Sequence, residues 1–314
     1  MPSTRTLVMA GLLASTGSAV VGARNLLTGQ AEQARTVIPK AWDIPPRADG
    51  VYTSGEPVTR WERGMAFDVH LMVFGDSTAT GYGCRDAAEV PGVLLARRLA
   101  EQSQKRVRLS TKAIVGATSK GLAGQVDAML VAGRPPDAAV IMIGANDVTA
   151  LNGIGPSARR LGAAVRRLRG AGAAVIVGTC PDFGVISAIP QPLRWTARSI
   201  GLQLARAQAA EVTAAGGIAV PLADLLSPHF RTDPARLFAD DGYHPSADGY
   251  ELVASQLLPA LCHALGDING DEIPELPWAA LPAARPLQSR LASLTRWAGR
   301  RTTGVPAPVV VSAV

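Results

Sequence analysis

Short, continuously apolar runs alternate along this chain with segments of helical periodicity. The apolar runs have the length and the β-branched content of buried strands, and the segments between them are long enough to be crossover helices. Strands that are apolar on both faces are typical of a parallel sheet covered by helices on both sides. The predicted strands are residues 69–74, 107–115, 138–144, 173–180 and, with a weaker pattern, 217–224. We therefore expect an α/β fold with about five parallel strands.

Helical periodicity predicts helices over residues 92–102 and 120–130, a third that begins at Pro156, and a last one that begins near Ser246. Proline is favoured in the first turn of a helix, where its missing N–H leaves no bond unmade, and serine is a frequent N-cap. Pro259 lies inside the last helix and is expected to bend it. These helices would connect the parallel strands and cover both faces of the sheet.

The composition of the chain divides it into four segments. Residues 1–23 carry one arginine followed by an uncharged stretch that ends in small residues, which predicts a signal peptide or an uncleaved membrane anchor. A buried helix of a soluble protein is the alternative. Residues 24–65 continue as a helix and a lead-in rich in proline and glycine, residues 66–266 hold the α/β domain, and residues 267–314 form a Pro-rich basic tail.

The net charge of +6 is concentrated at the two ends of the chain. Residues 1–40 contribute +3 and residues 276–314 contribute +5, so residues 41–275 have a balance of −2. A protein that binds nucleic acid needs basic side chains clustered on its folded body. We therefore expect no nucleic-acid partner, and expect both basic ends to contact a membrane surface instead.

The three cysteines, Cys84, Cys180 and Cys262, show neither a metal-ligand spacing nor a CxxC motif. Their odd number leaves at least one free thiol within a single chain. We expect free thiols, and a bridge between Cys180 and Cys262 is the alternative if the protein is exported.

Small or polar residues follow three of the predicted strands, and a fourth cluster precedes the last helix. The motifs are "GDST" with Ser77, "VGATS" with Gly116, "GAND" with Asn146, and "DDGYHPS" with Asp241 and His244. Each motif alone is also compatible with an ordinary turn or helix cap. Because functional crevices lie at the carboxyl ends of parallel strands, we expect these residues to gather at one edge of the sheet.

Together these residue types suit nucleophilic catalysis at a carbonyl group. A serine hydroxyl becomes a good nucleophile when a neighbouring imidazole accepts its proton, and the imidazole needs a carboxylate that orients it. We expect Ser77, His244 and Asp241 to take these three roles. The oxyanion that forms needs preorganised donors, which the N–H groups of Ser77 and Gly116 and the side-chain amide of Asn146 can supply.

This ordered set of residues resembles the SGNH/GDSL hydrolase family of serine esterases and lipases, in particular its exported actinobacterial members. The resemblance covers residues 66–266, with GDST in place of GDSL in the first motif. It implies a flavodoxin-like, three-layer α/β/α fold and a carboxylic ester hydrolase that needs no metal or organic cofactor. The expected reaction passes through an acyl-enzyme on Ser77, on an acyl ester of a lipid or a glycan, by a protein that is secreted or held in the cell envelope.

Two other functions use the same fold. An acyltransferase or deacetylase of envelope glycan or lipid would employ the same three residues, and differs in whether water or another hydroxyl receives the acyl group. A non-catalytic envelope binding protein would not need the complete set of residues. Asp240, Asp241 and His244 as metal ligands would lack a fourth ligand and leave the serine without a role.

Two aromatic residues, Phe183 and Trp195, follow the fourth predicted strand. They are candidates for the wall of an acyl pocket, and packing under a loop is the alternative for both.

The basic tail has a helical pattern of its own. Leucine and tryptophan recur at helical spacing at positions 287, 291, 294 and 297, with five arginines around them. A basic amphipathic helix of this kind lies in a headgroup layer, where each arginine near an anionic surface contributes about 1 kcal/mol. Packing of the apolar stripe onto the α/β domain is the alternative.

We predict that protein beginning at residue 24 co-sediments with anionic vesicles at low salt. A version that also ends at Asp271 should bind more weakly, because it lacks the five arginines of the tail. Vesicles of neutral lipid serve as the control. Equal, weak binding of both proteins would leave only the N-terminal segment as an anchor.

Overall fold

The computed structural model of this chain describes residues 25–30, 32–33, 45–47 and 49–266. The predicted signal peptide or anchor and the predicted basic tail lie outside the described residues. Residues 25–30 and 32–33 are helical, as the sequence predicts for the segment after the N-terminal stretch. Within the described ranges, no helix combines the length and the hydropathy that crossing a bilayer requires.

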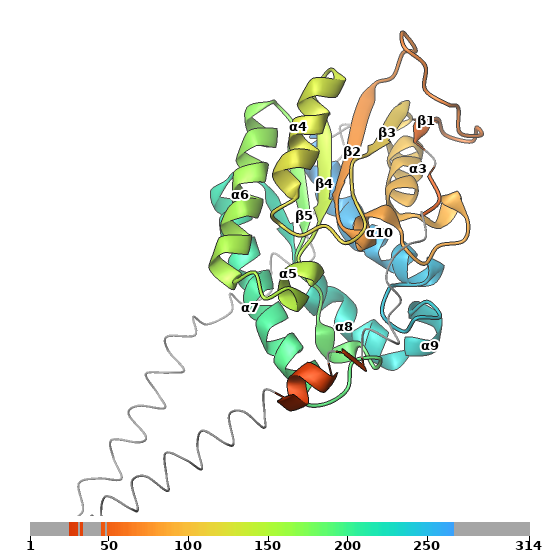
Figure 1. The fold of residues 1–314 in the computed structure, drawn as a ribbon. Coiled ribbons are helices and arrows are strands. Elements are labelled where there is room, and N and C mark those ends of the chain that lie inside the picture. Colours follow the sequence, from red (N-terminus) through yellow and green to blue (C-terminus); the bar gives the residue numbers. More distant parts are fainter. Residues whose placement is uncertain (1–24, 31, 34–44, 48, 267–314) are drawn as a thin grey trace, which may run out of the picture. The chain divides into compact units, whose positions relative to one another are not determined.

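A six-stranded sheet with the strand order β1-β3-β2-β4-β5-β6 forms the centre of the fold (Figure 1). Strands β2 to β6 run parallel, and β1 pairs antiparallel with β3 at one edge. The predicted parallel sheet is therefore confirmed, with β1 as an edge strand that the lead-in sequence did not indicate. The strands are β1 (Gly50–Tyr52), β2 (Val69–Gly75), β3 (Val107–Thr111), β4 (Ala138–Met142), β5 (Ala174–Gly178) and β6 (Ile218–Val220).

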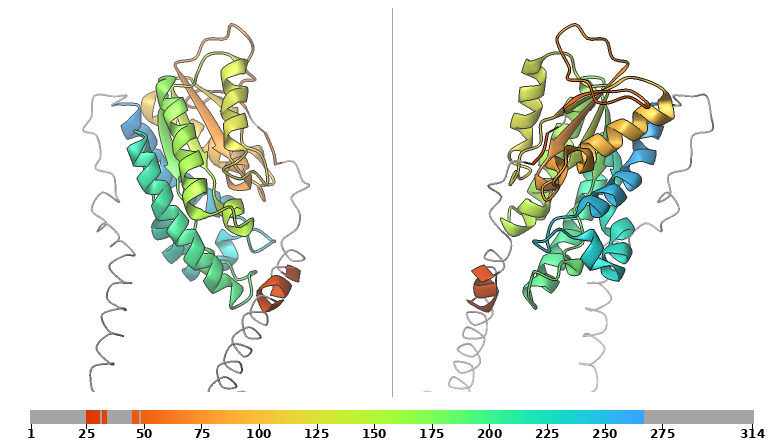
Figure 2. Two further views of the ribbon diagram at one scale, coloured as in Figure 1. Left: turned by 60° about the vertical axis from the view of Figure 1, so that its left-hand side comes forward. Right: turned by 90° about the vertical axis from the view of Figure 1, so that its right-hand side faces the viewer.

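Helices cover both faces of the sheet, which gives the three layers expected of a flavodoxin-like fold (Figures 1 and 2). One face carries α4 (Leu122–Ala132), α6 (Ile154–Gly170) and α7 (Leu193–Ala214), and the other carries α3 (Pro91–Ser103) and α10 (Ala247–Ala264). The connections between these elements hold α2 (Ser77–Thr80), α5 (Ala145–Thr149), α8 (Leu222–Thr232) and α9 (Pro234–Leu237).

Alternate side chains of the central strands enter two apolar cores. Met72 and Val175 are buried in the core beneath α4 and α6. On the opposite face Val73 is in register with Val140, and Gly92 lets α3 approach so closely that a Cβ there would lie 3.3 Å from the Val73 side chain. Each fully buried aliphatic side chain stabilises the fold by about 1.5–3 kcal/mol. Apolar burial on both faces therefore holds the central strands in place.

Helix α7 is the largest element that the hydrophobic pattern did not indicate. Its buried positions are mostly small residues and include a glutamine, so its apolar stripe is weak. Helix α6 begins at Ile154, two residues before the predicted start at Pro156. Helix α10 has Ser246 as its N-cap, as predicted, and continues past Pro259.

Strand ends differ from the predicted ones because the chain leaves the sheet early. The predicted strand 107–115 ends at Thr111, and the weak strand 217–224 ends at Val220, where Pro221 precedes α8. Both strands are therefore shorter than predicted, because the chain leaves the sheet after Thr111 and after Val220.

Two buried glutamines bind the backbone where the strands diverge. Gln125 of α4 accepts a hydrogen bond from the Gly75 N–H at 2.9 Å and donates one to the Gly75 carbonyl at 2.8 Å. Gln208 of α7 accepts from the Cys180 N–H at 2.7 Å and donates to the Ile143 carbonyl at 2.8 Å, just beyond the last paired residues of β4 and β5. Buried backbone groups are almost always paired, so these side chains allow the strands to separate at this edge.

Candidate active site

Ser77 lies in the first turn of the chain after β2. Gly75 ends the strand with a φ of +133°, and a Cβ at this position would collide with the Met142 carbonyl. Asp76 has an extended backbone and acts as the N-cap of α2, which begins at Ser77. Close approach of β2 and β4 and the turn at Gly75 therefore place the serine at the carboxyl edge of the sheet.

Asp76 is fully buried beside the serine. Its carboxyl oxygen accepts a hydrogen bond from the Thr78 N–H at 3.0 Å. Burial raises the pKa of Asp76 to about 6, although hydrogen bonds from the Thr78 and Gly144 N–H groups act in the opposite direction. The sequence marked Asp76 only as a turn residue.

Ser77, His244 and Asp241 form one hydrogen-bonded chain. The His244 Nε2 lies 2.9 Å from the Ser77 Oγ, and the His244 Nδ1 lies 2.6 Å from an Asp241 carboxyl oxygen. An ionised carboxylate can only accept a hydrogen bond, so the His244 Nδ1 that faces Asp241 carries the proton. The other ring nitrogen, Nε2, is then free to accept the serine proton. The structure thus brings together the three residues that the sequence predicted, across a separation of 167 positions.

The loop between α9 and α10 is built around the Asp241 carboxylate. Its second oxygen accepts hydrogen bonds from the N–H groups of Tyr243 and His244, each at 2.9 Å. Burial opposes ionisation of Asp241, but the hydrogen bonds from the His244 ring and from these two N–H groups outweigh it and lower its pKa. Asp241 is therefore an anion at neutral pH, which favours the charged form of the imidazole when it takes a proton.

Two tyrosine rings hold the imidazole of His244 in place. The Tyr82 ring lies 4.5 Å and the Tyr243 ring 4.9 Å from it, measured between centroids. The Tyr250 hydroxyl donates to the Tyr82 carbonyl at 2.7 Å, which anchors the segment after α2 to α10. The sequence analysis did not identify these tyrosines, although Tyr243 lies inside the motif that carries the histidine.

The predicted oxyanion donors lie on three adjacent strand ends. Since β2 lies between β3 and β4, the turns that hold Ser77, Gly116 and Asn146 are neighbours. Gly116 has a φ of +78°, which explains why glycine is needed there. Among the described residues, neither the Ser77 nor the Gly116 N–H donates a hydrogen bond to another group. The Asn146 Nδ2 donates to the Ala117 carbonyl at 3.0 Å and has a second hydrogen left for a ligand.

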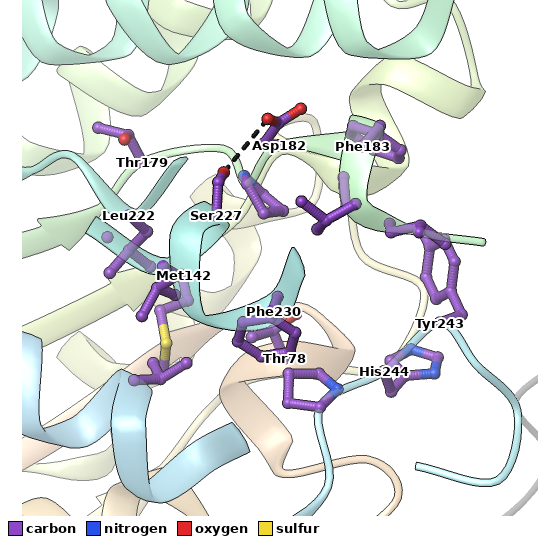
Figure 3. Close-up of a pocket in the computed structure, with 18 of the residues that line it drawn as sticks. Thr78, Met142, Thr179, Asp182, Phe183, Leu222, Ser227, Phe230, Tyr243 and His244 are labelled. Carbon is purple, nitrogen blue, oxygen red and sulfur yellow. Dashed lines mark hydrogen bonds between the residues drawn. The ribbon is translucent and has the colours of Figure 1, made fainter. Parts of the chain in front are cut away.

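A mostly apolar cavity of about 800 Å³, part of it open to solvent, adjoins His244 (Figure 3). It extends from the ends of β4 and β5 beneath α8 toward α10. Phe183 lines it, whereas Trp195 is 68% exposed and is not part of its wall. On one side of the cavity the Ser227 hydroxyl donates a hydrogen bond to the Asp182 carboxylate at 3.2 Å (Figure 3). Of the two aromatic candidates, only Phe183 therefore lies in the wall of this cavity.

Cys84, Cys180 and Cys262 are free thiols in this structure. Burial is the main cause that raises the pKa of Cys84 to about 12, so this thiol is not activated. No group of three or more histidine, cysteine, aspartate or glutamate side chains among the described residues is placed to hold a metal ion.

Two solved structures resemble the fold. A lipase/acylhydrolase from Enterococcus faecalis shares 26% sequence identity with a TM-score of 0.47, over 60% of this chain and 92% of that one. Axe2, an acetylxylan esterase from Geobacillus stearothermophilus, shares 21% identity with a TM-score of 0.49, over 68% of this chain and 95% of that one.

Sequence comparison gives a closer match. The model of the GDSL-like Lipase/Acylhydrolase family matches residues 73–252, which is more than half of the chain. GDSL-like esterase Rv1075c of Mycobacterium tuberculosis strain H37Rv is 67% identical over 282 residues, or 88% of this chain and 90% of that protein. The chain therefore belongs to the GDSL-like lipase/acylhydrolase family, the SGNH/GDSL hydrolases, and is an esterase.

Proposed function

We propose that this esterase hydrolyses acyl esters through an acyl-enzyme on Ser77, with His244 as the general base and acid. The observation that carries the proposal is the hydrogen-bonded chain from the Ser77 Oγ through both ring nitrogens of His244 to Asp241. A serine in this arrangement loses its proton to Nε2 as its oxygen attacks the ester carbonyl.

The two halves of the reaction use the same groups in opposite directions. In the first half a bond forms between the Ser77 Oγ and the acyl carbon, His244 holds the serine proton, and that proton passes to the alkoxide that leaves as an alcohol. In the second half a water gives its proton to His244 and attacks the acyl carbon. The serine then regains the proton and the acid is released.

The N–H groups of Ser77 and Gly116 and the side-chain amide of Asn146 are proposed to bind the oxyanion of both intermediates. Their support is the adjacency of the three turns and the unused hydrogens on each group. Donors that are already in place need no reorganisation when the charge develops, which is why such groups contribute strongly to rate.

The substrate is proposed to be an acyl ester of a lipid or a glycan in the cell envelope. The apolar cavity beside His244 supports an acyl chain longer than acetyl, because burial of each further methylene is favourable by about 0.8 kcal/mol. The predicted export signal supports the location. An alcohol acceptor that replaced water would make the same enzyme an acyltransferase.

We predict that a fluorophosphonate labels Ser77 and that the label is lost in Ser77→Ala and His244→Ala. Ser77→Ala should lower kcat roughly 10⁴-fold, since the residues of such a triad act as a unit. Peptide mass spectrometry identifies the labelled residue.

Ser103→Ala is the matched control, because this serine is also buried but lies on α3, where its hydroxyl donates to the Leu99 carbonyl and accepts from the Lys105 N–H. Labelling at a different serine in active protein would refute the assignment. Product analysis with and without an added alcohol distinguishes hydrolysis from acyl transfer.

We predict that Asn146→Ala lowers kcat roughly 10²–10³-fold, because one oxyanion donor is lost. The midpoint of thermal unfolding should change little compared with kcat. If kcat held steady and only the unfolding midpoint fell, the role of Asn146 would be limited to its hydrogen bond with the Ala117 carbonyl.

We predict that filling the cavity shifts the preference toward short acyl chains. Leu226→Phe and Ile186→Phe should lower the ratio of kcat/KM for p-nitrophenyl hexanoate over acetate by about tenfold or more. Val131→Phe adds the same ring on a side chain of α4 that is 89% exposed, and should leave the ratio unchanged. An unchanged ratio in both cavity variants would exclude this cavity as the acyl site.

A further inference from the structure

Asp147 is the buried residue that follows Asn146, and its carboxylate accepts four hydrogen bonds. One oxygen accepts from the Ser119 N–H at 2.8 Å. The other accepts from the Ser119 hydroxyl at 2.7 Å, the Ser157 hydroxyl at 2.9 Å and the Asn152 amide at 3.1 Å. Only 3% of the residue is exposed, so these bonds are made without competition from water.

These bonds connect three separate parts of the chain. Ser119 lies in the loop after β3, three positions beyond Gly116, and Ser157 lies in the first turn of α6. Asp147 itself lies on α5, and its side chain does not cap that helix. Its hydrogen-bonding capacity is therefore used to hold other elements against α5.

The neighbouring residue joins the same two elements. The Asn146 amide donates to the Ala117 carbonyl at 3.0 Å, one residue from Gly116. Two consecutive side chains of α5 thus bind both sides of the short segment from Ala117 to Ser119. These bonds attach the Gly116 loop directly to the helix that carries the Asn146 amide.

We propose that Asp147 is a positioning residue for the oxyanion site: it holds the Gly116 N–H and the Asn146 amide at the spacing that the oxyanion requires. The proposal rests on the function proposed above for Ser77, Gly116 and Asn146. Donors to a transition state must be held to within about 0.5 Å to be effective. Gly116 is exposed in a turn that the Ala117 N–H and the Ile114 carbonyl close at 3.0 Å, and the bonds to α5 fix the position of this turn. Asp147 supplies the constraint without touching the substrate.

Asp147→Asn tests this role with almost no change in the shape of the side chain. An amide has one oxygen and one NH2 group, so in one orientation its NH2 faces the Ser119 N–H, and in the other it faces the Asn152 amide. The first orientation opposes two donors at a buried backbone group, whereas in the second the part-buried Asn152 amide can turn its oxygen toward the new NH2 group. In the first orientation the Ser119 N–H loses its acceptor, which displaces the loop that carries Gly116.

The two serines separate positioning from general stability. Ser119 and Ser157 donate to the same carboxylate oxygen and are both almost fully buried, but only Ser119 lies on the Gly116 loop. Loss of either hydroxyl removes one hydrogen bond to the buried carboxylate and should lower stability by a similar amount. Only the loss at Ser119 should reach the oxyanion donors.

The experiment measures kcat, KM and the midpoint of thermal unfolding for Asp147→Asn, Ser119→Ala and Ser157→Ala with a soluble p-nitrophenyl ester. We expect Asp147→Asn to lower kcat by about tenfold or more with KM changed less than about threefold, because only the transition state uses these donors. Ser119→Ala and Ser157→Ala should lower the unfolding midpoint by similar amounts. Ser119→Ala should also lower kcat by about threefold or more, whereas Ser157→Ala should leave kcat within about twofold of the wild type.

A double-mutant cycle with Asn146→Ala provides the second readout. Asp147→Asn and Ser119→Ala should each cost less in kcat when Asn146 is already alanine, because one donor that they position is gone. Additive effects in this cycle, or equal losses of kcat in the two serine variants, would overturn the proposal. If Asp147→Asn fails to fold, the comparison of Ser119→Ala with Ser157→Ala tests the proposal without it. Hydrolysis that survives Ser77→Ala would instead refute the proposed function, whereas Ser77-dependent hydrolysis unaffected by Asp147→Asn and Ser119→Ala would refute the positioning role only.

Discussion

Hydrogen bonding of backbone groups at the carboxyl edge of the sheet is the constraint on which the site depends. Beyond the last paired residues, the strands separate and their buried N–H and C=O groups need other partners. Gln125, Gln208 and Asp147 provide these partners from α4, α7 and α5. A buried polar group without a partner costs about 1–3 kcal/mol, against a total stability of about 5–15 kcal/mol for a domain. The turns that carry the reactive groups are therefore held by side chains whose loss would disturb the fold as well.

The loop of His244 obeys the same constraint with a different side chain. The Asp241 carboxylate accepts from two backbone N–H groups of its own loop and from the imidazole. One anion thus shapes the loop, orients the ring and lowers its own pKa through these bonds against the effect of burial. Because the structural and the electrostatic contributions come from the same oxygens, a change at Asp241 alters both at once.

Sequence reasoning found Ser77, Gly116, Asn146 and His244 because their types are unusual in combination and because parallel strands end at one edge. It did not find Gln125 or Gln208, since a glutamine on a helix looks like any exposed polar residue. Their hydrogen bonds join residues 50 and 65 positions apart, and nothing in the local pattern reports such a contact. Both Phe183 and Trp195 were candidates for the pocket wall, and the exposure of Trp195 depends on the rotation of α7, whose apolar stripe is weak. Residue type and strand position thus predicted which side chains gather at this edge, whereas the glutamines that support them left no local pattern.

The strand order also separates the proposed oxyanion donors from the proposed acyl cavity. The proposed oxyanion donors lie at the ends of β3, β2 and β4, whereas the cavity lies at the ends of β4 and β5 and beneath α8. Ala145 and Asn146 form the border, because Ala145 lines the cavity and Asn146 is bound to the loop of Gly116. An acyl chain in the cavity would leave its carbonyl group at this border, with His244 next to both parts. In the proposed reaction, acyl-chain preference and rate would therefore depend on different elements of one sheet edge, α8 for the chain and the turns after β3, β2 and β4 for the oxyanion.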